Sequence, residues 1–176
     1  MAKLERDGEG STDRRRELAR RAAVLAEGDE IDGYLVAPKA TVIAELVKRV
    51  QPAAVLLGST QEGKEIAGRL AVKLDSGLIT DAVDVQSGDS GPVTTQSVFA
   101  GNYSVQAKVT KGTPVITVKP NSATPEEAAG AAAVEEFAAS VSETAKAARI
   151  TASEPRKASG RPDLTEAAIV VSGGRG

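Results

Sequence analysis

The stretch from Ala53 to Gly77 constrains the fold of this chain most, because an apolar run leads directly into an amphipathic helical pattern there. Residues 53–57 (AAVLL) show no alternation, which is typical of a parallel strand covered on both faces. Gly77 is a candidate left-handed cap for the helix. A buried strand that leads into a helix is the repeating unit of α/β proteins. The apolar stripe of the helix follows three- and four-residue steps and consists of Ile66, Ala67, Leu70, Ala71 and Leu74.

The same stretch contains a near-match to a phosphate-binding loop. Gly58 to Lys64 (GSTQEGK) fits the first seven positions of the G-x-x-x-x-G-K motif, between a strand and a helix. The next position requires Ser or Thr to hold magnesium, but here it is Glu65, and Glu62 adds a carboxylate that would repel phosphate. We therefore favour a plain strand-to-helix turn, with an adenine-nucleotide site as the alternative.

The composition excludes several classes of function. The 176 residues include no histidine and no cysteine, which removes disulfides, thiol nucleophiles, histidine bases and the usual zinc ligands. The net charge of −2 predicts no nucleic-acid partner. No run of eighteen apolar residues suggests a membrane span, and the N-terminus lacks the apolar core of a signal peptide. We expect a cytoplasmic protein that is not an enzyme in its own right.

Two regions contain further candidate groups. A helix is expected from Thr12 or Asp13 to Gly28, with an arginine-rich side that is either an anion-binding patch or, more simply, a solvated face. Asp81 and Asp84 interrupt the predicted strand at residues 78–85. Three residues apart on a strand, they point to opposite faces, which argues against a shared metal or acid–base site.

The remaining pattern predicts a layered α/β fold with a mostly parallel sheet, flanking helices and an antiparallel hairpin excursion. Residues 41–50 form a second helical stripe after Pro38. The runs 93–100 and 103–109, separated by Gly101 and Asn102, predict the hairpin. Residues 115–118 (VITV) again suggest a buried strand.

The C-terminal third changes character. Residues 121–160 are rich in Ala, Glu, Ser and Thr, and we interpret them as a linker. Within it, residues 128–148 form either a weak helix or an extended segment laid over the domain. Residues 167–171 (AAIVV) predict a strand that ends in the glycine-rich turn from Ser172 to Gly176.

Four segments in this order resemble the alpha subunit of electron transfer flavoprotein, from about Ile31 to the end. They are the GKEIAGRLA helix with its following SGL, the hairpin, the strand PVITV, and the run from RPDLTEA to VSGGRG. The resemblance implies a nucleotide-binding-like N-terminal α/β domain and a C-terminal domain that holds most of an FAD. It also implies a beta-subunit partner and electron transfer from acyl-CoA and related dehydrogenases to a quinone oxidoreductase. By the same resemblance, Arg175 lies at the flavin.

The resemblance also has limits, which set the expected domains. Residues 1–30 do not resemble the family and are expected to be an atypical helical extension. Residues 31–120 are the α/β domain, 121–160 the linker, and 161–176 the start of a truncated FAD domain. The chain is therefore expected to be a partial alpha subunit that mainly scaffolds and docks, with weak or no FAD binding alone. The alternative is a stand-alone adenine-nucleotide-binding domain that uses the turn from Gly58 to Lys64.

Overall fold

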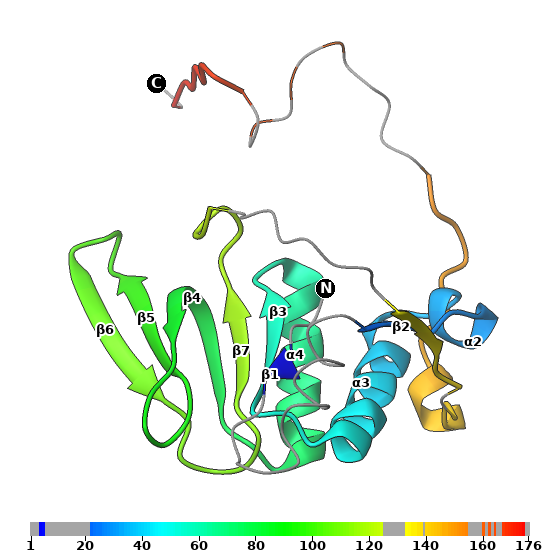
Figure 1. Ribbon diagram of the computed structural model, residues 1–176. Coiled ribbons are helices and arrows are strands. Elements are labelled where there is room, and N and C mark those ends of the chain that lie inside the picture. The colour runs from blue at the N-terminus through cyan, green and yellow to red at the C-terminus, as the bar shows by residue number, and fades with distance from the viewer. Residues whose placement is uncertain are drawn as a thin grey trace.

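The computed structural model describes residues 4–5, 22–124, 133–138, 140–154, 160, 162, 164 and 167–174. The centre of the structure is a six-stranded sheet with the strand order β1-β3-β7-β4-β5-β6 (Figure 1). β3, β7 and β4 pair in parallel, whereas β1, β5 and β6 are antiparallel to their neighbours. The strands are β1 (Leu4–Glu5), β3 (Ala54–Gly58), β4 (Leu78–Gln86), β5 (Val93–Val98), β6 (Tyr103–Lys108) and β7 (Val115–Val118). The predicted α/β fold is confirmed.

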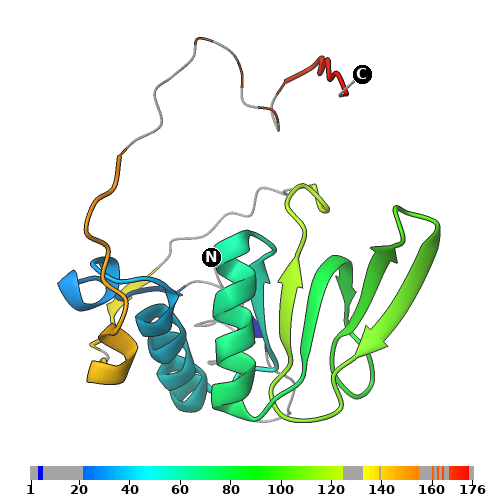
Figure 2. The same cartoon turned by 180° about the vertical axis from the view of Figure 1, so that it is seen from behind.

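Two long helices pack on one face of this sheet. α4 (Gln61–Leu74) contacts β7, β3 and β4, and α3 (Val36–Val50) packs beside α4. Figure 2 shows α4 lying over β3 and β7, with α3 next to it. The one-turn helix α2 (Asp29–Asp32) precedes α3. The chain thus follows the strand–helix–strand order that the apolar stretch from Ala53 predicts.

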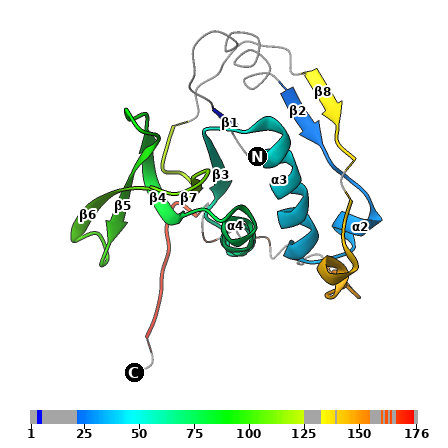
Figure 3. The ribbon, with the colours of Figure 1, turned by 90° about the horizontal axis from the view of Figure 1, so that it is seen from below.

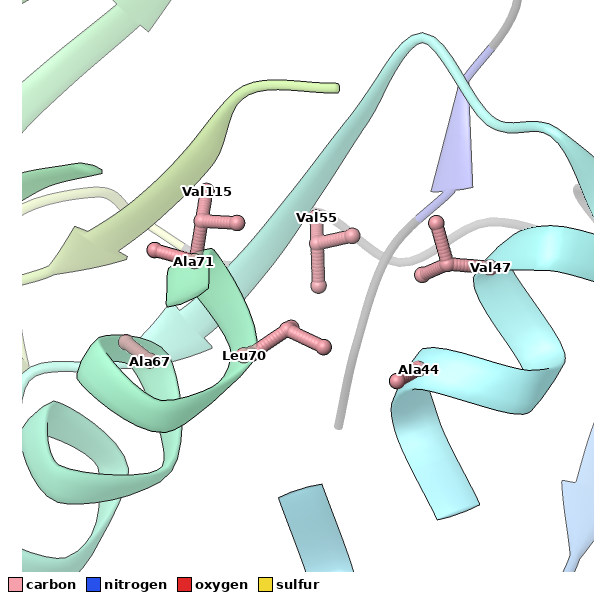
Figure 4. Close-up of a cluster of buried hydrophobic side chains, with 7 residues drawn as sticks. All are labelled: Ala44, Val47, Val55, Ala67, Leu70, Ala71 and Val115. Atoms are coloured by element: carbon pink, nitrogen blue, oxygen red, sulfur yellow. The ribbon is translucent and has the colours of Figure 1, made fainter. Parts of the chain in front are cut away.

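The core forms where these two helices meet the sheet. Leu70, Val55 and Val115 are each fully buried, and they belong to α4, β3 and β7 respectively. Figure 4 shows their side chains pointing toward one another between the two helices and the sheet. The predicted stripe on α4 supplies this contact through Ala67, Leu70 and Ala71. The core is aliphatic, as the scarcity of aromatic residues requires.

The ends of both helices differ from the prediction. α3 begins at Val36 and includes Pro38, although we expected the helix to start after that proline. Proline is tolerated there because the first turn of a helix has no internal acceptor for its amide groups. At the end of α4, the left-handed residue is Asp75, with φ 49°, rather than Gly77. A Cβ on Gly77 would lie 2.8 Å from the Val109 side chain, so close packing explains this glycine.

The prediction of a helix from Thr12 or Asp13 to Gly28 is wrong for residues 22–28, the part of this range that the structure describes. β2 (Ala22–Leu25) pairs in parallel with β8 (Ala133–Glu136) instead. Figure 3 shows these two strands side by side, beyond α3 and away from the main sheet. Pairing with a segment far along the chain overrides the local helical preference. Residues 6–21, and with them the arginine cluster up to Arg21, lie outside the described residues.

The C-terminal segment lies against the domain in its described parts. Residues 133–136 are a strand and Glu143–Lys146 form the single-turn helix η1, so the weak helix is wrong there and the extended alternative is confirmed. The backbone N–H groups of Leu35 and Ile150 donate to the carbonyl groups of Ala148 and Gly33. Lys146 pairs with Glu30 of α2 at 2.9 Å and with Glu143 at 2.6 Å. These carboxylates raise the pKa of Lys146.

The strand predicted at residues 167–171 is not formed. None of these residues is assigned to a strand, and Ile169 and Val171 are 83% and 93% exposed. Figure 1 shows this segment away from the sheet. An apolar run becomes a strand only when a neighbour satisfies its backbone groups, and no described element pairs with it. The domain boundaries proposed from the sequence stay a prediction.

Candidate functional site at the carboxyl edge of the parallel strands

Polar side chains gather where the parallel pairing of β3, β7 and β4 ends. Ser59 directly follows β3, and Lys64 lies in the first turn of α4. Thr117 is the last residue but one of β7, and Asp81 lies within β4, where its parallel pairing with β7 ends at Ala82. β7 is inserted between β3 and β4, so these positions lie next to one another. In open α/β sheets, this edge is where ligands bind. The cluster is therefore the first place to look for chemistry.

The four side chains form a closed hydrogen-bond network. Ser59 Oγ donates to Asp81 Oδ1 at 2.7 Å, and Lys64 Nζ lies 2.8 Å from the same oxygen. The Asp81 N–H donates to Thr117 Oγ1 at 3.1 Å. The hydroxyl oxygens of Thr117 and Ser59 are 2.9 Å apart. Because the Ser59 proton is directed to Asp81, Thr117 is the donor in this last bond.

The backbone at Asp81 is irregular, and the network holds it. Asp81 has φ 59°, in the left-handed region that aspartate enters more readily than most residues. The register of β4 against β7 shifts between Ile79 and Ala82. This bulge turns the Asp81 carboxylate toward β3 and α4. Bulges often redirect a side chain near a functional edge.

The electrostatics keep Asp81 ionised. The hydrogen bond from Lys64, followed by that from Ser59, holds the pKa of Asp81 below its ordinary value, and the charge of Lys119 adds to this, while partial burial opposes it. A carboxylate with a lowered pKa is a weak base, so the site is poorly suited to general base catalysis near neutral pH. The arrangement stabilises the edge of the sheet rather than activating a reacting group.

The turn from Gly58 to Lys64 is closed by contacts of its own. Thr60 Oγ1 accepts a hydrogen bond from the Gly63 N–H at 3.0 Å, as an N-cap of α4. A Cβ on Gly63 would lie 2.0 Å from the Gly58 carbonyl oxygen, so this position requires glycine. Lys64, which would contact phosphate in a working loop, is held by Asp81. These contacts support the structural turn over a nucleotide site.

Asp81 and Asp84 have separate partners. Asp84 accepts hydrogen bonds from the Val85 N–H and from Gln86 Nε2, away from the Ser59–Lys64 network. The bulge at Asp81 replaces the simple alternation on which the expectation of opposite faces was based. Among the residues that the structure describes, no group of three or more acidic, histidine or cysteine side chains is placed to hold a metal ion.

The sequence analysis missed Ser59 and Thr117 as members of this cluster. Both are small hydroxyl residues, which resemble ordinary strand or turn residues in a single sequence. The sequence did contain a signal for the pairing of Asp81 with Lys64. A carboxylate inside an apolar strand requires a partner, and Lys64 begins the helix of the same strand–helix–strand unit. The role of Thr117 depends on β7 being inserted between β3 and β4, which local patterns do not predict.

The described residues do not by themselves fit a flavin. Arg175, the residue that the resemblance places at FAD, lies outside the described residues. The segment before it, residues 167–174, has exposed apolar side chains and forms no cradle. A surface groove of about 570 Å³ lies at the opposite, amino end of β3 and β7, between Pro52, Lys108 and Pro114. It is not adjacent to the polar cluster.

The hydropathy of the helices adds one finding. Within the described part of the chain, no helix combines the length and the apolar character that crossing a membrane requires.

Comparisons with known proteins give a family. Residues 7–142 match the electron transfer flavoprotein domain. The chain is 46% identical over 153 residues to electron transfer flavoprotein subunit alpha of Mycobacterium leprae. These aligned residues cover 86% of this chain and 46% of that subunit. The electron transfer flavoprotein alpha subunit of Syntrophomonas wolfei is 35% identical to this chain over 158 residues. These aligned residues cover 86% of this chain and 48% of that subunit. The chain thus spans about half the length of these relatives.

The family match begins at residue 7, whereas the resemblance in the sequence analysis begins at about Ile31, and the matched residues include β2. The domain boundaries, with the extension at residues 1–30, stay a prediction.

Proposed function

The chain belongs to the electron transfer flavoprotein family, and we propose that it serves as the α/β scaffold of an alpha subunit, which docks a beta subunit and supports the FAD domain. The observation that carries this proposal is the 46% identity to an alpha subunit over 86% of the chain. The α/β fold agrees with it. The complex would be cytoplasmic. It would carry electrons from acyl-CoA and related dehydrogenases to a quinone oxidoreductase.

The proposed role is that of an electron carrier subunit rather than a catalyst with its own substrate. The relatives are named as subunits of an electron carrier. The polar cluster supports this role, because Asp81 is held ionised and Lys64 is engaged by Asp81. Because the pKa of Asp81 is lowered, its carboxylate is a weak base at neutral pH.

FAD is the cofactor of the proposed complex, where its isoalloxazine ring would accept and deliver electrons. Arg175 is the one residue of this chain that we propose at the flavin. A guanidinium group there would hydrogen-bond the ring or stabilise its anionic form. The remaining contacts would come from groups outside the described residues. We therefore propose that the 176-residue chain alone binds FAD weakly or not at all.

Copurification with the beta subunit tests this proposal. The chain would be expressed alone and together with the beta subunit of its own organism, with the beta subunit alone as the control. We expect a one-to-one complex by light scattering after gel filtration, and no flavin absorbance from the chain alone. Absence of any complex would contradict the docking role. One tightly held flavin per chain, without the beta subunit, would contradict the scaffold role.

The adenine-nucleotide alternative has no comparable support. It requires Lys64 to be available for phosphate, but Lys64 Nζ lies 2.8 Å from Asp81 Oδ1. The relatives are named for electron transfer.

A further inference from the structure

A groove lies on the solvent side of α4, between this helix, the start of α3 and the C-terminal segment at η1. Its volume is about 480 Å³, and pockets for small organic ligands occupy roughly 300–1,000 Å³. The lining side chains lie within residues 37–41 of α3, 68–73 of α4 and 142–145 of the C-terminal segment. The polar cluster at the carboxyl edge contains none of these residues, so the groove is a separate site.

Two residues of α4 leave apolar space open in the groove. Val72 is 83% exposed, whereas Leu70, two residues earlier, is fully buried. A Cβ on Gly68 would meet no described atom within 4 Å, so packing does not require glycine there. Glycine inside a helix costs about 1 kcal/mol relative to alanine. Because residues four apart on a helix are neighbours, this glycine keeps the space beside the exposed valine open.

The charges that line the groove are of one sign. Among the described residues of the lining, the charged ones are Arg69 and Lys73, and none is a carboxylate. Glu65 contacts Arg69 at 3.0 Å and compensates part of its charge. Within the described part of the chain, no carboxylate pairs with Lys73. The groove therefore attracts an anion, and Lys73 supplies most of the attraction.

The C-terminal segment closes one side of the groove. η1 contacts α3, and Ala145 of η1 is buried. The Lys146 side chain, only 14% exposed, pairs with Glu30 at 2.9 Å and with Glu143 at 2.6 Å. The segment is thus held beside Val72 without covering it, which leaves the valine available to a ligand.

We propose that this groove binds a small organic anion with an apolar body. The apolar part covers Val72 and occupies the space beside Gly68, and the negative charge lies at Lys73 and Arg69. Burial of apolar area supplies affinity and a few charged groups orient the ligand, as in most pockets for small molecules. Such binding goes beyond the proposed scaffold function and requires no beta subunit.

The groove suits an inorganic anion less well. Thr41 Oγ1 donates to the Ala37 carbonyl oxygen at 3.0 Å, and the hydroxyl oxygens of Ser142 and Thr144 lie 3.0 Å apart, within hydrogen-bond distance of each other. These hydroxyl groups are already engaged within the chain. A bare phosphate would also leave Val72 exposed to water. The ligand class therefore follows from the apolar surface together with the positive charge.

The test uses two fluorescent probes that differ in charge. The anionic probe is anilinonaphthalene sulfonate, and the neutral one is phenylnaphthylamine, which has the same rings without the sulfonate. Both are titrated into the full chain, and their fluorescence rises on transfer from water to an apolar site. We expect a single site for the sulfonate probe, with an affinity at least about threefold higher than for the neutral probe, because an exposed charge pair contributes about this much.

Three variants locate the site. Val72→Asp removes apolar surface and adds a repelling charge, so it should weaken binding of the sulfonate probe about tenfold or more. Lys73→Gln should weaken it about threefold and leave the neutral probe unchanged. Lys48→Gln is the matched control, since Lys48 is an exposed lysine in the last turn of α3, as Lys73 is in α4, but lies outside the groove. Circular dichroism melting checks that each variant is folded.

Three results would overturn the assignment. An effect of Lys73→Gln no larger than that of Lys48→Gln would show that no charge of the groove holds the probe. Binding that Val72→Asp leaves unchanged would place the sulfonate probe elsewhere on the chain. Equal or tighter binding of the neutral probe would exclude a site for anions. None of these results depends on the beta subunit, so the copurification experiment tests the proposed function separately.

Discussion

The core beneath the parallel strands and the β5–β6 hairpin differ in how their residues are used. In the core, Leu70, Val55 and Ile116 are fully buried, and at the carboxyl edge the polar side chains of the cluster satisfy one another. In the hairpin, aromatic rings are exposed and no other described strand pairs with the outer edge of β6. The first region stabilises the fold. In the second, the strained backbone at Phe99 and the exposed rings contribute little to the buried core.

The largest expected effect is a truncation in the core. Leu70→Ala should lower the free energy of unfolding by about 2–5 kcal/mol, because it removes a fully buried side chain between α4 and the sheet. Urea unfolding followed by circular dichroism measures this loss. Val72→Ala, on the exposed side of the same helix, is the control and should change it by less than about 0.5 kcal/mol. Equal effects of the two would contradict the position of the core.

The carboxyl edge should show a smaller, pH-dependent effect. Asp81→Asn keeps a residue that tolerates the left-handed conformation but removes the charge that Lys64 contacts. Both side chains are more than a third exposed, so we expect a loss of about 0.5–1 kcal/mol at neutral pH. The pKa of Asp81 is lowered in the folded state. Its contribution is therefore complete above the unfolded value of 3.8 and is lost as the pH falls through the folded value.

Unfolding at pH 7 and at pH 2.5 measures this dependence. The difference between the unaltered chain and Asp81→Asn should shrink at the lower pH, because Asp81 is then increasingly protonated in both states. Asp84→Asn, whose carboxylate has other partners, serves as the control. A difference that stays constant or grows on acidification would show that the Lys64–Asp81 pair does not stabilise the fold.

The hairpin should show the smallest effect on stability. Phe99→Gly should change the free energy of unfolding by less than about 1 kcal/mol, because relief of the left-handed conformation and loss of the edge-to-face contact with Tyr103 oppose each other. Thermal and urea unfolding of the isolated chain measure it. A loss larger than about 1 kcal/mol would mean that the ring of Phe99 contributes to the fold, and the contrast with the core would fail.

Local patterns predicted the elements whose causes are local. The strand at Val115–Val118 has the predicted bounds, the α4 stripe forms the core, and the hairpin forms from the two predicted runs. The hairpin loop is wider than predicted, because Phe99 and Ala100 join Gly101 and Asn102 in it.

Long-range pairing explains what the sequence did not predict. β2 is a strand because it pairs with β8, more than a hundred residues later, although alanine and leucine favour a helix. The contacts of Asp81 with Ser59 and Thr117 require three strands to lie in the order β3-β7-β4. Periodicity within one segment contains no information on that order. The segment at residues 167–171 has the pattern of a strand but no described neighbour to pair with.

Hydrogen exchange of the full chain tests the contrast between core and hairpin most directly. We predict that the amide groups of Tyr103–Lys108 exchange faster than those of the core strands, because β6 pairs with only one described strand and most of its residues are exposed. The amide groups of Ala54–Gly58 and Val115–Val118, which pair inside the sheet, should exchange most slowly. Equal exchange of β6 and of these core strands would contradict the account.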